Sequence, residues 1–353
     1  MSIWDAYPPD YRAQEVRAIV TAALAGECVS IMGLSGAGKS NLLGFIAHTQ
    51  SRPGHAFLLT DLNRLPEATP EALFSQIGRA LSEGSVPGST PTLETLSVLI
   101  EKRLTRPESS LTLLLDRFDA VAGSPVVAGN LRALRDAHRY QLIFVTATRR
   151  ALPPHSELSE LFYAHQLWLG SLSETDARWN IRRYAARRGL AWDSAVEDRL
   201  LTVSAGYPSF LRAVCEAHAA GAGPELADLA AHPAVRMRVE EFLADGPTEE
   251  ELRRAGLANA PLLRAGRTSV EVPAGLTAKE ARLLSYFQAH PHVVCEKDDL
   301  IRAVWPEDKI FERGVRDDSL AQLVRRLREK IESETARPQH ILTAAGRGYR
   351  YEP

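Results

Sequence analysis

Cysteine is scarce in this chain of 353 residues. The only three cysteines, Cys28, Cys215 and Cys295, lie far apart and have neither the paired spacing of a zinc site nor that of a redox motif. We therefore expect buried free thiols and exclude a disulfide framework. Excess charge of one sign is also missing, because the formal net charge is only −2. Any affinity for nucleic acid must then come from a local patch of basic residues.

Long hydrophobic runs are absent as well. No uninterrupted apolar segment approaches the roughly 20 residues that span a bilayer, and the first residues lack a basic stretch followed by an apolar run. We therefore expect a cytoplasmic protein without a membrane partner. The chain is 45% hydrophobic and 24% charged, a composition that suits two or three globular domains at this length.

The first half alternates apolar strand-like runs with amphipathic helical segments. The runs cover residues 28–32, 56–59, 111–115 and 141–146. This alternation predicts an α/β domain with a parallel sheet. From Ser173 the pattern becomes wholly helical, and Ser173 with Asp176 forms a capping signal at the start of a helix. We expect a small helical lid there.

The period changes again after Gly266. Thr268, Val270 and Val272 alternate as a short strand, and a capping box of Thr277 and Glu280 then opens a helix. A second, α+β domain is expected to begin here. The predicted order is a nucleotide-binding core over 1–170, a helical lid over 171–220, a helical connector over 221–265 and the C-terminal domain over 266–353.

Residues 33–40 read GLSGAGKS, which matches the GxxxxGK[ST] phosphate loop. The motif follows an apolar strand and precedes a helix, as its mechanism requires. Glycines let the backbone N–H groups face the phosphates, Lys39 supplies a charge to the β and γ oxygens, and Ser40 supplies an oxygen to Mg²⁺. The predicted ligands are ATP or ADP with Mg²⁺. The residues expected to contact the nucleotide are Gly33, Ser35, Gly36, Ala37, Gly38, Lys39, Ser40 and Asn41.

The run 111–116 is a buried strand that ends in Asp116, as a Walker B element requires in order to hold Mg²⁺. Arg117 follows, where many AAA+ proteins have a catalytic Glu, and the next acid is Asp119. Here the sequence resembles the STAND and NACHT-like P-loop ATPases, in which an acid three residues after the metal Asp is common. The resemblance implies that Asp119 positions the attacking water. Alternatively, Asp119 caps the following turn, and hydrolysis is then very slow or absent.

Three further positions match nucleotide-contacting segments of AAA+ and STAND proteins. Arg149 and Arg150 follow a strand at the place of sensor 1 and would report the γ-phosphate, although exposed surface arginines are the alternative. Ala205-Gly-Tyr-Pro208 resembles the Gly-x-Pro lid motif of STAND and origin-recognition ATPases, which implies that Pro208 touches the base. Proline at a first helical position needs no nucleotide, however. Tyr11-Arg12-x-x-Glu15 lies where such families carry an adenine-facing segment, although a short exposed helix is the alternative.

The C-terminal 88 residues contain LTAKEARLL from Leu276, a segment ending in Trp305-Pro306, SLAQLVRRLR from Ser319 and GRGYR from Gly346. In this order they resemble the OmpR/PhoB-type winged helix. Apolar residues between 320 and 331 recur at helical spacing, so a basic face is left for the major groove of double-stranded DNA. Arg347 lies between two glycines in a predicted hairpin wing. The expected DNA-binding residues are Arg316, Gln322, Arg325, Arg326, Arg328, Arg347 and Arg350.

Two functions fit this domain order. The first is a transcriptional regulator in which nucleotide state, through a homo-oligomer and slow hydrolysis, controls the winged helix. The second is a DNA-stimulated ATPase that acts as an assembly factor in transposition, replication or defence against foreign DNA. A P-loop domain that binds nucleotide only for structure, and a winged helix used for protein contact, are further alternatives. The activating signal, which a partner protein could supply, is not encoded in any motif.

Overall fold

The computed structural model describes residues 2–65, 67–82, 91–104, 106, 108–152, 157–269, 276–290, 292–305, 317–332, 337–344 and 346–352. The chain forms two compact units. The first comprises Met1–Asn180 with Gly206–Ser209 and Glu249–Ala258, and the second comprises Ile181–Ala205, Phe210–Thr248 and Asn259–Pro353. Short segments from far along the chain therefore return to the N-terminal unit. The domain limits expected from the sequence stay predictions.

A five-stranded parallel sheet lies at the centre of the first unit, in the order β2-β3-β4-β1-β5. Its strands are β1 (Val29–Met32), β2 (His55–Asp61), β3 (Ser110–Asp116), β4 (Leu142–Thr148) and β5 (Gln166–Trp168). Every described residue of β1 and β4 is buried, which is why these strands read as continuous apolar runs. The predicted α/β P-loop fold with a parallel sheet is confirmed. The short β5 was not predicted, because it has only three residues and begins with the exposed Gln166, so it forms no apolar run.

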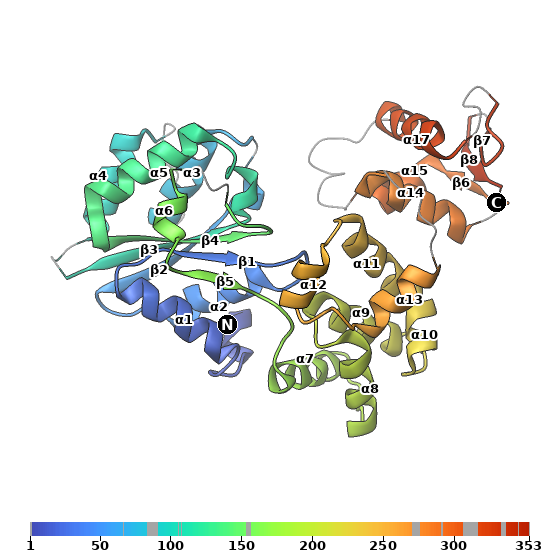
Figure 1. The fold of residues 1–353 in the computed structure, drawn as a ribbon, viewed down its shortest axis with the longest axis horizontal. Coiled ribbons are helices and arrows are strands. Elements are labelled where there is room, and N and C mark those ends of the chain that lie inside the picture. The colour runs from blue at the N-terminus through green and yellow to red at the C-terminus, as the bar shows by residue number, and fades with distance from the viewer. Residues whose placement is uncertain are drawn as a thin grey trace. The chain divides into compact units, whose positions relative to one another are not determined.

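Helices cover both faces of this sheet (Figure 1). One face carries α1 (Ala13–Leu24) and α2 (Lys39–Thr49), and the other carries α3 (Pro70–Leu81), α4 (Leu93–Arg103) and α5 (Pro125–His138), with α6 (Ser159–Phe162) nearby. Short 3-10 turns occupy η1 (Ile3–Ala6), η2 (Leu62–Arg64), η3 (Phe118–Ala120) and η4 (Arg139–Gln141). In such a fold, ligands bind at the carboxyl ends of the strands, where β1 runs into α2.

The middle of the chain is helical, as predicted. It contains α7 (Glu174–Arg187), α8 (Ser194–Ser204), α9 (Pro208–Ala219), α10 (Leu226–Ala231), α11 (Pro233–Ala244), α12 (Glu249–Arg254) and α13 (Pro261–Ser269). The capping signal at α7 is present, because the Asp176 backbone N–H donates to Ser173 Oγ at 3.1 Å. The strand expected from Thr268 was wrong at its start, since Thr268 belongs to α13. The apolar alternation there is too short to outweigh helix continuation. Val270 and Val272 lie outside the described residues.

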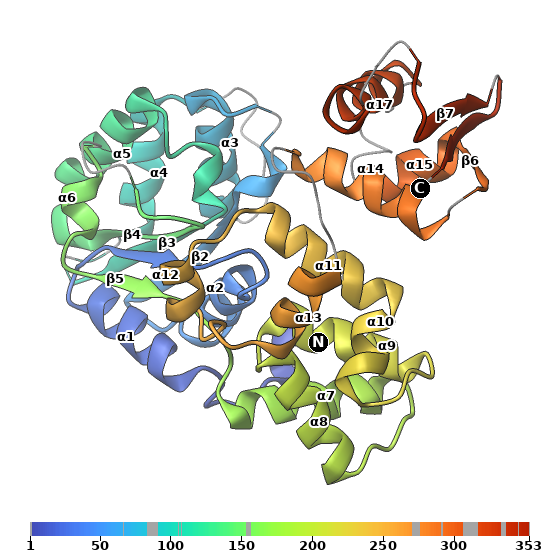
Figure 2. The same ribbon diagram turned by 45° about the vertical axis from the view of Figure 1, so that its right-hand side comes forward.

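The C-terminal domain has the helices and the sheet of a winged helix (Figure 2). Its helices are α14 (Ala278–Ala289), α15 (Lys297–Val304) and α17 (Asp317–Ile331), and its sheet is β6-β8-β7, formed by β6 (Val294–Glu296), β7 (Ile341–Ala344) and β8 (Gly348–Tyr351). The predicted capping box of Thr277 and Glu280 opens α14. Leu283, Phe287 and Leu327 pack in its core with Trp305. The predicted α+β winged helix is therefore confirmed.

The cysteines and the lengths of the helices concern two features that we expect to be absent, a disulfide framework and a membrane span. All three cysteines are buried and free. Within the described ranges, none of the helices has the length and apolar character needed to cross a bilayer.

Candidate nucleotide site and candidate DNA-binding face

The phosphate loop connects β1 to α2, which begins at Lys39. Gly36 and Gly38 adopt φ of +83° and +89°, a left-handed backbone conformation that residues other than glycine rarely adopt. A Cβ added at Gly36 would also lie 2.2 Å from Ser209 Oγ. Glycine is thus required at Gly36 both by the backbone and by the close approach of another segment.

Three successive carbonyls of this loop are held from outside. The Ser35 carbonyl accepts from Tyr207 Oη at 2.9 Å, and the Gly36 carbonyl accepts from the Ser209 backbone N–H at 3.2 Å. The Ala37 carbonyl accepts from Arg12 Nη2 at 3.0 Å. The loop is therefore fixed by two segments distant in sequence, one before β1 and one at the start of α9.

Lys39 is at the first position of α2, and its ammonium folds back onto the loop. Nζ donates to the Gly33 carbonyl at 2.5 Å and to the Leu34 carbonyl at 3.3 Å. Burial lowers the pKa of Lys39 to about 8, against the opposing effect of Asp119 and Asp116. A partly desolvated cation at a helix N-terminus is a setting that favours an anion, so these residues fit a nucleotide phosphate.

This lowered pKa predicts how ATP affinity depends on pH. A bound phosphate favours the ammonium form of Lys39, but the free site loses that proton above a pKa of about 8. ATP affinity should therefore be constant below about pH 8 and fall above it, by up to roughly tenfold per pH unit. Titrations of ATP between pH 7 and 9.5 measure this directly. The Lys39→Arg variant, whose guanidinium stays charged, should show a flatter profile; equal slopes for both proteins would contradict the assignment.

Asp116 ends β3 beside the phosphate loop. Its pKa is raised, first by burial, while a hydrogen bond with the Ser40 side chain acts in the opposite direction. The two residues predicted to serve Mg²⁺ therefore lie close enough for the Ser40 hydroxyl to act on the Asp116 carboxylate. A hydroxyl paired with a partly desolvated carboxylate is the oxygen donor set that Mg²⁺ uses beside phosphates, so the residues present also fit this metal.

Asp119 is exposed and accepts from the Arg149 backbone N–H at 2.8 and 3.1 Å. Its carboxylate thus caps the end of β4. Its charge also raises the pKa of Lys39, whereas the charge of Arg149 lowers it. Arg150 points elsewhere: its Nε lies 3.0 Å from Glu251 Oε1 of α12. The structure brings Asp119 and Arg149 to the end of the sheet next to Lys39, at the start of α2. Both interpretations of Asp119, water positioning and turn capping, remain compatible with these contacts.

The remaining predicted nucleotide contacts flank the loop. A Cβ added at Gly38 would lie 3.6 Å from Pro208 Cγ, so the proline is next to the phosphate loop. The Asn41 amide donates to the hydroxyls of Tyr7 at 2.9 Å and Tyr11 at 3.4 Å. Tyr11 is only 2% exposed, and its ring packs edge-on against Phe45. Tyr11 therefore supports the start of α2 from within the core.

Arg12 lies in the segment that the sequence resemblance places at the adenine, but its side chain instead binds the phosphate loop, a contact that the sequence did not predict. Its side chain is 1% exposed, its backbone is left-handed with φ 47°, and Nη1 pairs with Glu15 at 2.8 Å. Nη2 bridges the Ala37 carbonyl and the Gly170 carbonyl, both at 3.0 Å. The backbone N–H of Arg12 donates to the Asp176 carboxylate at 3.2 Å. One buried guanidinium thus joins the phosphate loop to the connection between β5 and α7.

On the winged helix, α17 presents the predicted polar face. Gln322, Arg325 and Arg326 are exposed, whereas Leu320, Leu323, Val324 and Leu327 are buried. Arg347 lies in the turn between β7 and β8, where its backbone N–H donates to the Ala344 carbonyl at 3.0 Å. Arg316 lies outside the described residues.

The predicted DNA-contacting arginines differ in their intramolecular bonds. Arg328 donates to the Ile341 carbonyl at 2.6 and 3.0 Å and lies over the Tyr349 ring, so it joins α17 to the wing. Arg325 pairs with Glu329 at 3.1 Å, and Arg350 pairs with Glu352 at 2.7 Å. Such exposed pairs are weak and can be exchanged for a phosphate at little cost.

Comparison with known families assigns the C-terminal domain. Residues 271–351 match the family model described as "Transcriptional regulatory protein, C terminal". The chain is 36% identical over 77 residues to the transcriptional regulatory protein YvrH of Bacillus subtilis, a match covering 22% of this chain and 31% of YvrH. It is 39% identical over 75 residues to SphR of Synechococcus elongatus, an alkaline phosphatase synthesis transcriptional regulatory protein, covering 21% and 28%. The expected resemblance to regulators of this type is confirmed for this domain, and the chain spans about a third of these relatives.

Solved structures similar to the chain cover nearly all of it. One is the Walker-type ATPase paby2304 of Pyrococcus abyssi, with a TM-score of 0.48, 15% identity and coverage of 99% of this chain and 97% of that one. Another is the Orc1 protein of Aeropyrum pernix in complex with DNA, with a TM-score of 0.43, 13% identity and coverage of 99% and 90%.

Proposed function

We propose that this protein is a DNA-binding transcriptional regulator whose winged helix is controlled by ATP. One observation carries the proposal. A formed phosphate loop and a regulator-type winged helix belong to one chain, and part of the segment between them packs in the first unit, the nucleotide module that contains the phosphate loop. That segment includes α12, which packs in the first unit although the chain before and after it belongs to the second. Nucleotide is therefore proposed as the signal that regulates the winged helix.

The nucleotide would be held by this chain's own groups. The loop from Gly33 to Lys39 receives the phosphates, and Ser40 with Asp116 holds Mg²⁺. When bound, Mg²⁺ neutralises phosphate charge next to a carboxylate whose pKa is raised by burial. Pro208, whose ring lies beside Gly38, closes the site on the side of α9.

A set of contacts supports a route from this site to the winged helix. Arg12 binds the carbonyls of Ala37 and Gly170, and the next residue, Ser171, donates its backbone N–H to the Ala255 carbonyl at 3.1 Å. Ala255 directly follows α12. A movement of the phosphate loop would therefore reach α12 through three hydrogen bonds.

A second set of contacts ties α12 to the strand edge of the nucleotide site. Glu251 pairs with Arg150, two residues after β4, and the Arg254 guanidinium lies 5.8 Å from the centre of the Trp168 ring on β5. We assign α12 as the element that senses whether the site is filled. The chain then continues from α12 through α13 towards the winged helix, so the two ends are linked covalently as well.

The winged helix supplies the output. The exposed face of α17 would enter the major groove of double-stranded DNA, and Arg347 in the wing would reach a phosphate or the minor groove. Self-association in the ATP state would place several winged helices along the DNA. Hydrolysis, positioned by Asp119 with Arg149, would be slow and would reset the switch.

Binding to genomic DNA fragments with ATP, ADP or no nucleotide tests the proposal. We expect ATP to give tighter, sequence-selective binding and larger particles. The competing function, a DNA-stimulated ATPase acting as an assembly factor, predicts instead that any duplex strongly raises ATP turnover without selectivity. DNA affinity and particle size that are the same with ATP, with ADP and without nucleotide would refute the proposed control.

A further inference from the structure

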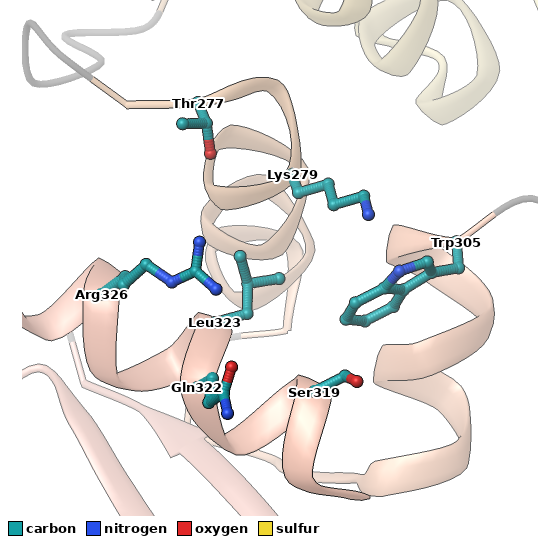
Figure 3. A pocket seen from close by; sticks show the side chains of 7 residues that line it. All are labelled: Thr277, Lys279, Trp305, Ser319, Gln322, Leu323 and Arg326. Carbon is teal, nitrogen blue, oxygen red and sulfur yellow. The ribbon is translucent and has the colours of Figure 1, made fainter. Parts of the chain in front are cut away.

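A hollow of about 390 Å³ opens on the winged helix, between the start of α14, the end of α15 and the first half of α17 (Figure 3). Lys279 projects into it from α14, and the Trp305 ring forms one wall. Ser319, Gln322 and Arg326 line the opposite side from α17. Two cationic side chains therefore converge on one hollow beside the helix predicted to read DNA.

Lys279 and Arg326 have no acidic partner among the described residues. Within the part of the chain that the structure describes, neither Lys279 nor Arg326 pairs with a carboxylate; the Lys279 ammonium lies 5.2 Å from the centre of the Trp305 ring. The neighbouring Lys330 differs, because it pairs with the buried Glu280 at 2.6 Å. The hollow thus holds positive charge that no described carboxylate pairs with.

The lining favours a phosphate group over a stacked base. Trp305 is 8% exposed and belongs to the domain core, so little of its ring is available to stack on a ligand. Ser319 and Gln322 instead offer a hydroxyl and an amide, which are common donors to phosphate oxygens. The hollow also borders the exposed face of α17, and backbone phosphates flank a helix that enters the major groove.

We propose that this hollow receives a backbone phosphate of duplex DNA and that Lys279 is a DNA contact. Lys279 and Arg326 supply the charge, and Ser319 and Gln322 supply hydrogen bonds. The inference rests on the DNA-binding part of the proposed function and does not need nucleotide control. Lys279 was missed by sequence reasoning because it lies on α14, 38 residues before the start of α17 at Asp317, and only the fold brings the two together.

The salt dependence of DNA binding tests this contact. Each phosphate neutralised by a cation contributes about 0.9 to the slope of log affinity against log salt concentration. The Lys279→Ala variant should bind random and selected duplexes less tightly by the same factor, with a slope smaller by about 1. The control Lys102→Ala removes an exposed lysine of α4 in the other unit and should leave affinity and slope unchanged. Both proteins are assayed without nucleotide.

Amine labelling gives a second readout on the unmodified full chain. Duplex DNA should protect Lys279 from labelling but not Lys102, whereas inorganic phosphate at the same phosphate concentration should protect neither. Protection of Lys279 by inorganic phosphate but not by duplex would overturn the proposal in favour of a free-anion site. A parent protein that binds no duplex would refute the proposed function and the contact together. A parent that binds duplex with the same salt slope as Lys279→Ala would refute only the contact.

Discussion

The Lys39→Ala variant should lose ATP binding while it keeps nucleotide-free DNA binding. The Lys39 ammonium, at the first position of α2, donates to the Gly33 carbonyl of the loop, and the charges of Asp119 and Asp116 act on it. A hydrogen bond to a charged group is worth about 1.5 to 3 kcal/mol, so we expect a loss of at least tenfold to a hundredfold in affinity. Calorimetric titration with ATP and Mg²⁺ measures this loss.

Two controls make that result specific. Lys102→Ala changes an exposed lysine of α4 and should bind ATP like the parent protein. Lys39→Arg keeps the charge and should retain part of the affinity. Unaltered ATP affinity in Lys39→Ala would mean that the GLSGAGKS loop is not the nucleotide site, and the ATP control proposed for the winged helix would fail with it.

Arg12→Ala should have the second largest effect, on both stability and coupling. The change removes a buried guanidinium that joins the carbonyls of Ala37 and Gly170, and it leaves both without that donor. We expect the free energy of unfolding of the first unit to fall by about 2 to 4 kcal/mol. The difference in DNA affinity between the ATP and ADP states should shrink towards zero. Denaturant unfolding and DNA titration measure the two effects.

The conservative variant Arg12→Lys separates the effect of Arg12 on coupling from its effect on stability. In Arg12→Lys, a compact ammonium cannot serve both carbonyls with the geometry of a planar guanidinium, so ATP should still bind while the ATP-to-ADP difference in DNA affinity is reduced. Glu15→Gln is the matched control, because it removes the charge of the Arg12 partner but not the bonds to Ala37 and Gly170. Full coupling in a folded Arg12→Lys protein would exclude Arg12 from the route.

Local motifs made much of this protein predictable from sequence. The phosphate loop, the strand ending in Asp116 and the capping box of Thr277 and Glu280 each depend on residues within about ten positions of one another. The apolar spacing of α17 likewise fixed which side chains are buried and which face solvent. These features hold because neighbouring residues alone determine the conformation.

Contacts between distant residues could not be predicted in this way. Arg12 meets Gly170 across 158 residues, and Arg150 meets Glu251 across 101. Nothing in the sequence around Tyr11-Arg12 indicates that the arginine turns inward while the tyrosine packs on Phe45. The return of α12 to the nucleotide module is equally invisible in composition, since its Glu and Arg residues are typical of any exposed helix.

The basic residues of the winged helix also have surroundings that the sequence did not predict. Sequence grouped Arg325, Arg326 and Arg328 as one DNA-binding set, but the fold gives them different surroundings. Arg328 is bonded to the β7 backbone, so its replacement would disturb the wing as well as any DNA contact. Arg326 faces the hollow with Lys279 and is the cleaner test of DNA binding. Which of these residues contact DNA stays a prediction.

The most direct test of nucleotide control is the affinity of the full chain for ATP with and without saturating cognate DNA. Coupling between two sites is reciprocal, so if ATP tightens DNA binding, cognate DNA must tighten ATP binding by the same factor. We predict an increase of about fivefold or more, as typical coupling energies of 1 to 3 kcal/mol imply. The increase should be absent with random duplex and reduced in Arg12→Lys. Identical ATP affinity with and without cognate DNA would contradict the account, because the nucleotide module and the winged helix would then act independently.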